Sequence, residues 1–231
     1  MRSVLRTEKK YLIGAHEYAA KRQVLSAVLT ADRHSVGGGY PVRSLYFDTP
    51  YDMDFYEKQD GVELRRKIRL RCYDPGADFA MLEMKQKHGQ AQRKRSLRLR
   101  RGEVERIIAG DLSPLTRLED PFAAELYGFM HAKCYRPKTI VEYDREAFII
   151  PGSDTRITFD RNIRATESSF DLFSHRLNLN PVLDSYCVVM EVKYNGFLLS
   201  YVRDLIGSVD RNELSVSKYV LARQQGYLTH L

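Results

Sequence analysis

The sequence predicts an α+β fold in which about eight antiparallel strands are flanked by helices. Stretches that alternate between polar and apolar residues, rich in Ile, Val, Tyr, Phe and Thr, recur along the chain and predict the strands. Turn sequences such as "DPGAD", "HGQ" and "PGSD" separate several of these stretches and favour antiparallel hairpins. Segments with apolar residues at spacings of three and four interrupt the strands and predict helices.

The predicted strands cover residues 4–13, 41–49, 62–73, 79–87, 93–100, 139–150, 155–163 and 186–195. The predicted helices cover residues 15–29, 102–110, 121–133, 195–207 and 213–226, with a short helical turn expected at "FDLF" in the long connection before the last strand. The glycine run "GGGY" at 37–40 lacks the G-K-[ST] ending of a nucleotide-binding loop, so a flexible loop is expected there.

At 231 residues the chain is long enough for one large domain or two small ones, and we expect one domain over residues 1–231 in a cytoplasmic protein. A hydrophobic content of 43% supports a substantial core, and the formal net charge of +7 favours polyanionic partners without choosing among them. Cys72, Cys134 and Cys187 form no C-x-x-C pair, so neither a disulfide framework nor a zinc site is expected. No signal peptide or membrane span appears, and any work at a membrane would need a membrane-associated partner protein.

One predicted strand is cationic along an entire face. Within "ELRRKIRLRCY", the residues Arg65, Lys67, Arg69 and Arg71 alternate with mostly apolar neighbours, and side chains alternate across a strand. A row of like charges repels itself unless carboxylates or an anionic ligand lie beside it, and phosphate is the obvious ligand. For a strand taken alone, a solvated edge whose charges discourage pairing explains the pattern as well.

Other strands repeat this division into a charged face and an apolar face, with mixed signs. Any single E-x-K pair is explained by a salt bridge on a solvated sheet, but repetition on so many strands weakens that explanation. The strands form either an open sheet that is wet on one side or a barrel whose lumen holds the charges. The sets that share a face are Arg6, Glu8 and Lys10; Glu83, Lys85 and Lys87; Arg156, Thr158 and Asp160; and Glu191 and Lys193.

A set of ordered stretches resembles the VTC-type polyphosphate polymerase domain, which belongs to the triphosphate tunnel metalloenzymes. The resemblance extends over nearly the whole chain, and its order makes it more specific than any single motif. The stretches are "RTEKKYLI", "VRSLYFDTP", "EKQDGVELRRKIRLRCY", "LEMKQKHG", "KRSLRL", "VEYDREAF", "RITFDRNIR", "VMEVKYNGFL" and "SVSKYVL".

The resemblance implies a closed eight-stranded antiparallel barrel, the triphosphate tunnel, with basic residues that bind ATP and a growing phosphate chain. The residues expected to orient phosphates during catalysis are Arg69, Arg71, Lys85, Lys94, Arg145 and Arg156. Those expected to bind substrate elsewhere in the tunnel are Lys10, Arg65, Lys67, Lys193 and Lys218. The expected metal ligands are Glu191, joined by Glu83 or Glu8, and the expected cofactor is Mn²⁺ or Mg²⁺.

Two departures from the family pattern bear on activity. The wider superfamily begins with E-x-E-x-K, whereas this chain has Arg6-Thr7-Glu8-Lys9-Lys10, so arginine replaces one carboxylate that hydrolytic members use. Similar eukaryotic polymerases carry a second lysine three residues before the one matching Lys218, where this chain has Ser215.

The expected function is a polymerase that transfers the γ-phosphate of ATP to inorganic polyphosphate. A triphosphatase or nucleotide hydrolase using the same tunnel is the first alternative, and a non-catalytic polyphosphate-binding module is the second. Nucleic-acid binding is not expected, because the tyrosines fall within strand motifs without an aromatic RNA-recognition signature. The sequence leaves the oligomeric state open.

Overall fold

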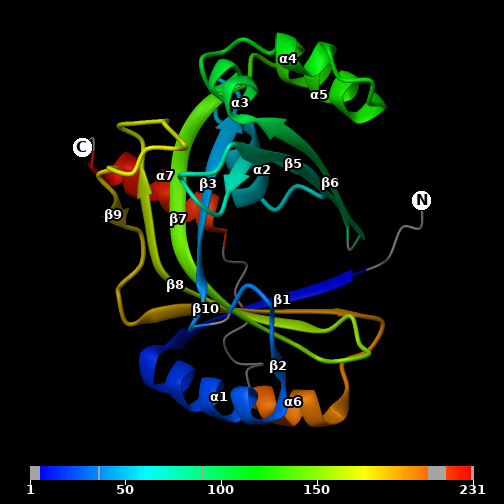
Figure 1. The fold of residues 1–231 in the computed structure, drawn as a ribbon, viewed down its shortest axis with the longest axis vertical. Helices are drawn as coiled ribbons and strands as arrows, with labels where there is room; N and C mark the ends of the chain where they lie inside the picture. The colour runs from blue at the N-terminus through cyan, green and yellow to red at the C-terminus, as the bar shows by residue number, and fades with distance from the viewer. Residues whose placement is uncertain (1–5, 36, 90, 208–216, 230–231) are drawn as a thin grey trace.

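The computed structural model of the protein describes residues 6–35, 37–89, 91–207 and 217–229, and all strands within these residues belong to one antiparallel sheet (Figure 1). Its main path runs in the order β1-β10-β8-β7-β3-β4-β5-β6, with β2 paired to β7 and β9 paired to β8. The strand bounds are β1 (Arg6–Gly14), β2 (Thr30–Ala31), β3 (Tyr40–Asp48), β4 (Leu64–Cys72), β5 (Phe79–His88), β6 (Ala91–Arg100), β7 (Arg136–Ile149), β8 (Arg156–Thr166), β9 (Asn180–Pro181) and β10 (Cys187–Asn195).

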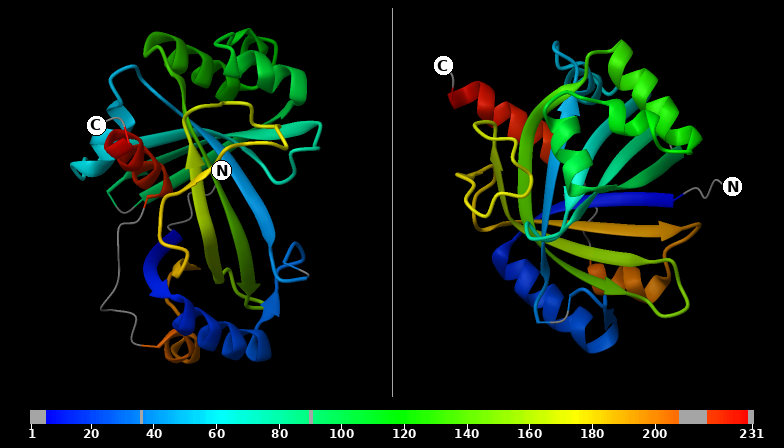
Figure 2. Two further views of the ribbon diagram at one scale, coloured as in Figure 1. Left: turned by 90° about the vertical axis from the view of Figure 1, so that its left-hand side faces the viewer. Right: turned by 45° about the horizontal axis from the view of Figure 1, so that its top comes forward.

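All eight predicted strands are present, and the α+β class is confirmed. The closed barrel is not what the structure has: over the described residues, no backbone ladder joins β1 to β6, and these two strands end the path. Side chains make the connection instead, because Lys85 Nζ on β5 lies 2.7 Å from Glu8 Oε2 on β1. The sheet therefore curls into a concave form whose two halves face each other across the inner side (Figure 2).

Most of the helices lie outside this curl, whereas the last helix and Phe55 of the second helix pack against side chains of its inner side. Their bounds are α1 (Ala15–Val28), α2 (Met53–Gln59), α3 (Arg101–Ile108), α4 (Ser113–Thr116), α5 (Pro121–Ala132), α6 (Ser200–Ile206) and α7 (Lys218–Thr229). None of the helices described has both the length and the apolar character needed to span a membrane.

Most apolar side chains of the strands are buried against these helices in two cores on the outer side, and a third apolar cluster lies on the inner side. One core joins Leu70 and Leu82 of the β3–β6 half to Leu126 and other residues of α3–α5. The second joins Met190 of the β1–β10–β8 half to Leu25 of α1 and the apolar side of α6. Burial of apolar side chains on the convex side of both halves forces the alternate, charged residues onto the concave side.

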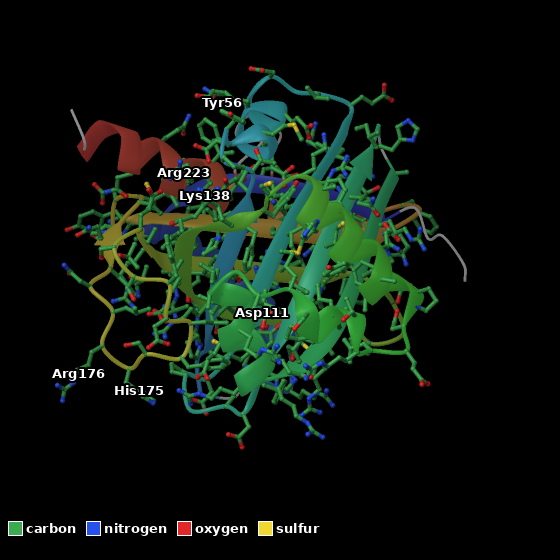
Figure 3. All side chains as sticks on the ribbon, turned by 90° about the horizontal axis from the view of Figure 1, so that it is seen from above. Tyr56, Asp111, Lys138, His175, Arg176 and Arg223 are labelled. Atoms are coloured by element: carbon green, nitrogen blue, oxygen red, sulfur yellow. The ribbon has the colours of Figure 1, made fainter. Side chains whose placement is uncertain are left out.

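Helix α7 packs against the concave side itself, over one end of it (Figure 1). The ring of Tyr219 stacks on Tyr46 with centroids 5.1 Å apart, and its hydroxyl group donates to Asp48 Oδ2 at 2.6 Å. Arg223 and Lys138, which lie near one another in Figure 3, both pair with the carboxylate of Asp52. Buried polar contacts as well as apolar packing thus hold helix α7 against the sheet.

Some predicted boundaries need correction. The helix predicted at 195–207 begins only at Ser200, because β10 extends to Asn195 and Gly196 adopts a positive φ of 67°. The helix predicted from residue 213 begins at Lys218 in the described part, and Ser215 lies outside it. The expected helical turn at "FDLF" is a plain turn at 172–173, whose two residues fill the first core.

Candidate phosphate-binding site

The concave side of the sheet carries three clusters of charged residues, contributed by seven strands and the start of α7. The clusters centre on the carboxylates of Glu83, of Asp160, and of Glu8 with Glu191. Cations outnumber these carboxylates on the inner side, so the chain's own acids neutralise only part of the positive charge. Such a surface attracts a polyanion.

The first cluster lies across strands β3 to β6. Arg69 Nε and Nη2 each lie 2.8 Å from Glu83 Oε2, and its Nη1 donates to the Tyr46 hydroxyl group at 3.1 Å. Lys94 Nζ lies 2.5 Å from Glu83 Oε1, while Arg71 Nη1 is 3.7 Å from Oε2. Burial raises the pKa of Glu83, but Arg69, Arg71 and Lys94 outweigh burial and lower it to about 2. Of the three cations, Arg71 therefore lies farthest from the Glu83 carboxylate.

The second cluster joins β7, β8 and the start of α7. Arg145 grips the buried carboxylate of Asp160 in a bidentate pair, with Nε–Oδ1 and Nη2–Oδ2 distances of 2.7 and 2.8 Å. Lys218 Nζ lies 2.6 Å from Oδ2, and both cations lie over the ring of Tyr143. Burial raises the pKa of Asp160, but Arg145 and Lys218 overcome this and lower it to about 2. Arg145 also reaches Glu191 Oε2 at 3.6 Å, which links this cluster to the third.

The third cluster spans the two facing halves of the sheet. Glu8 Oε1 lies 3.1 Å from Lys10 Nζ, Glu8 Oε2 lies 2.7 Å from Lys85 Nζ, and Glu191 Oε1 lies 3.1 Å from Lys193 Nζ. Burial opposes ionisation of both carboxyl groups, yet the surrounding cations lower the pKa of Glu8 and lower that of Glu191 further. The two carboxyl groups are close enough that each affects the pKa of the other.

Lys67 is a cation of the inner side that contacts no carboxylate within the described residues. Its Nζ donates to Ser217 Oγ at 2.6 Å, just before α7 begins. Burial lowers the pKa of Lys67 well below its usual value, and the positive charges of Lys10 and Lys85 lower it further. An anion bound beside Lys67 would raise this pKa, because an opposite charge favours the protonated form.

Two other predicted site residues lie apart from the three clusters. Arg156 donates from Nη2 to the Tyr40 hydroxyl group at 2.9 Å and pairs with Asp32 Oδ2 at 2.8 Å, at one end of the inner side. Arg65 donates from Nη1 to the Val62 carbonyl oxygen at 2.8 Å, and no ion pair among residues 6–35, 37–89, 91–207 and 217–229 places it in a cluster. The structure thus gathers most of the predicted cations in the three clusters, whereas Arg156 and Arg65 make their contacts outside them.

The predicted metal ligands fit a divalent ion only in part. Glu8 and Glu191 lie together, whereas Glu83 belongs to a different cluster and is held by Arg69 and Lys94. Among the described residues, no group of three or more Asp, Glu, His and Cys side chains is arranged to hold a metal. Mg²⁺ usually takes one or two carboxylates together with phosphate oxygens and water, and this is what Glu8 and Glu191 could provide.

The sequence did not single out several residues that complete these clusters. Tyr46, Tyr143 and Ser44 lie between the charged side chains, and each contacts at least one of their cations. Tyr46 and Ser44 alternate on the inner face of β3, so the strand period could have placed them there. Their closeness to Arg69 and Arg71 depends on register, with Tyr46 opposite Arg69 and Ser44 opposite Arg71.

A sequence model of the VTC domain family matches residues 5–227. The chain belongs to the VTC domain family. This confirms the resemblance inferred from the ordered motifs and makes the protein a tunnel-fold protein that handles phosphate or nucleotide compounds. A search of curated proteins found no match to this VTC domain.

Solved structures that are similar to this VTC domain have low sequence identity to it. A protein of Bacillus halodurans described as a candidate adenylate cyclase has a TM-score of 0.50 and 10% identity, with 91% of this chain and 92% of that chain covered. A candidate adenylate cyclase from Vibrio parahaemolyticus gives 0.49 and 12%, with 95% and 99% covered. The PH1819 protein from Pyrococcus horikoshii gives 0.48 and 11%, with 95% and 99% covered. At 10% identity, the likeness to the Bacillus halodurans protein concerns the fold alone.

Proposed function

We propose that the protein is a polyphosphate polymerase that transfers the γ-phosphate of ATP to a growing inorganic polyphosphate chain on the concave side of the sheet. The observation that carries the proposal is the surplus of cations there, in a chain of the VTC family. A surplus that continues through three neighbouring clusters suits an extended polyanion better than a single orthophosphate. The proposal includes a tunnel completed around the substrate, for which the Lys85–Glu8 pair between facing strands is the starting point.

The chemistry that these residues support needs no protein nucleophile. A terminal oxygen of the phosphate chain attacks the γ-phosphorus of ATP, the bond from that phosphorus to the β–γ bridging oxygen breaks, and ADP leaves. Because phosphoryl transfer depends on positioning and charge neutralisation, an ionised terminal phosphate requires no strong general base. Arg71 presents a planar fork to phosphate oxygens, Arg145 adds positive charge while Nε and Nη2 hold Asp160, and the lysines add mobile positive charge.

The remaining predicted residues have roles that follow from their positions. Arg69 and Lys94 hold Glu83, which fixes the orientation of the cationic strand face, and Lys85 with Lys10 and Lys193 surrounds the Glu8–Glu191 pair. Glu191 and Glu8 are the carboxylates that would hold Mn²⁺ or Mg²⁺. A divalent ion bound there would neutralise phosphate charge and offset the repulsion between carboxylates and substrate.

Hydrolysis of a triphosphate is the rival activity of the same site, with water in place of the chain end. The replacement of one superfamily carboxylate by Arg6 favours transfer over hydrolysis, and the side chain of Arg6 lies outside the described part of the structure. A binding module without activity is the second rival. Both are outcomes of the same experiment.

The test is a product analysis with the purified protein. We would incubate it with ATP and either Mn²⁺ or Mg²⁺, then resolve the products on a gel that separates long phosphate chains from orthophosphate. The proposal predicts long chains, with an equal amount of ADP for each phosphate added. Orthophosphate alone would identify a hydrolase, and neither product would identify a binding module. The Arg145→Ala variant, which removes a cation from the second cluster, controls for a contaminating enzyme.

A further inference from the structure

Aromatic side chains gather on the charged inner side where β3 begins, beside Arg145 of the second cluster. The ring centroids of Tyr40 and Tyr73 are 6.0 Å apart with an interplanar angle of 57°, and those of His34 and Tyr40 are 6.1 Å apart. Tyr40 begins β3, and Tyr73 directly follows β4, the strand that pairs with β3. These rings come from three separate segments, so the fold brings them together.

The tyrosines differ in how firmly they are held. Tyr40 accepts a hydrogen bond from Arg156 Nη2 at 2.9 Å, and the same nitrogen lies 2.8 Å from Asp32 Oδ2. Tyr73 is 46% exposed, and its hydroxyl group makes no hydrogen bond within the described part of the chain. One ring is therefore fixed, while the other leaves a face open to solvent beside it.

The position of these rings relative to the phosphate-binding cations is set by the sheet. Tyr73 lies two residues beyond Arg71, which places it on the same strand side about 7 Å farther along. Tyr40 is the register partner of Arg145, which forms the bidentate pair with Asp160 in the second cluster. A ligand with phosphates on Arg71 and Arg145 would thus have its next chemical group beside Tyr40 and Tyr73.

We propose that Tyr40 and Tyr73 form a stacking site for the base of the nucleoside triphosphate, and that this end of the inner side admits the nucleotide. The inference rests on the proposed function, since it places the donor of the phosphate. Aromatic rings bind any base through its π-face, so stacking predicts little discrimination between ATP and GTP. The Tyr73 ring is suited to this role because it is accessible to a ligand and lies beside Tyr40 on the strand that carries Arg71.

The experiment compares ATP, which has a base, with tripolyphosphate, which has none. Calorimetric titrations in EDTA, where turnover is prevented, would give the affinity of each ligand for the wild type, for Tyr73→Leu and for Tyr51→Leu. Tyr51 is a matched control, because it is 87% exposed and follows the opposite end of β3 from Tyr40. Loss of a base–aromatic stack predicts that Tyr73→Leu weakens ATP binding by about five-fold or more. Tripolyphosphate affinity should stay within two-fold in both variants.

Each outcome separates this inference from the proposed function. Equal weakening of ATP and tripolyphosphate by Tyr73→Leu, or no weakening of either, would overturn the stacking site while the phosphate site stands. A wild-type protein that binds neither ligand would overturn the proposed function and the stacking site with it. Photo-crosslinking with 8-azido-ATP gives a readout without substitution: we expect label, competed by ATP, on the peptide that contains Tyr40 or Tyr73. Competed label only on other peptides would contradict the inference.

Discussion

Arg71→Ala is the substitution that probes the phosphate site with least damage to the fold. Arg71 is only 7% exposed, yet its contacts within the protein are weak: Nε lies 3.3 Å from Ser44 Oγ and Nη1 lies 3.7 Å from Glu83 Oε2. Glu83 keeps Arg69 and Lys94 when Arg71 is removed. We therefore expect a loss of unfolding free energy of about 1 kcal/mol, the range for one modest hydrogen bond.

The effect on binding should be larger than the effect on stability. A guanidinium that hydrogen-bonds a charged phosphate contributes about 1.5–3 kcal/mol, which corresponds to a rise in Kd of roughly 10- to 150-fold. Arg71→Lys keeps the charge and loses the planar fork, so its loss should lie between that of alanine and the wild type. The fully engaged Arg69 should behave differently, because Arg69→Ala also breaks the 2.8 Å contact with buried Glu83 and costs stability.

Tripolyphosphate titrations, followed by calorimetry in EDTA, measure this directly, and thermal unfolding of the same samples checks the fold. Arg176→Ala is the matched control, because Arg176 lies in the exposed connection before β9, away from the inner side (Figure 3). An Arg71→Ala protein that is folded and binds tripolyphosphate as tightly as the Arg176→Ala control would refute the assignment of the concave side as the phosphate site.

Three further predictions address the metal, a buried acid and a close backbone contact. Glu191→Gln should reduce transfer by orders of magnitude while metal-free ATP binding survives or tightens; a Mn²⁺ titration that shows near-normal turnover would remove Glu191 from the metal site. Burial, with Asp48 adding to it, raises the pKa of Asp54 to about 8, so the folded state binds the extra proton and stability falls as pH rises from about 4 to 8. In urea unfolding, Asp54→Asn should remove this pH dependence of the unfolding free energy, which is about 1.4 kcal/mol per pH unit. An unchanged pH dependence would show that a group other than Asp54 causes it. Gly39→Ala should destabilise the protein and weaken tripolyphosphate binding, because its Cβ would lie 2.7 Å from the Arg145 carbonyl oxygen at a φ of +124°; a thermal midpoint equal to wild type would contradict this.

Alternation within strands predicted which side chains would share a face. The four cations of β4 and the Glu83–Lys85 pair of β5 were assigned from the period of two, and register then placed Arg69 opposite Glu83 and Lys67 opposite Lys85. Contacts between distant strands could not be predicted in this way. The Glu8–Lys85 pair joins residues 77 positions apart and depends on how far the sheet curls, which no local pattern encodes.

Short elements were missed for a related reason. Helix α2 has seven residues and α4 has four, too few for a helical period to emerge from the sequence, and both are fixed by contacts made elsewhere. In α2, the amide groups of Asp54 and Phe55 donate to the buried carboxylate of Asp48. The glycine run was read as a flexible loop, whereas Gly39 lies against the Arg145 backbone, a close approach that appears only once the chain is folded.

A structure of the protein with tripolyphosphate and Mn²⁺ tests the central claim most directly. The account predicts a phosphate chain on the concave side, within hydrogen-bonding distance of Arg71, Arg145 and Lys67, and a metal held by Glu191 and phosphate oxygens. Tripolyphosphate bound only on the convex, helix-covered side, with Arg71 and Arg145 still paired as in the free protein, would contradict it.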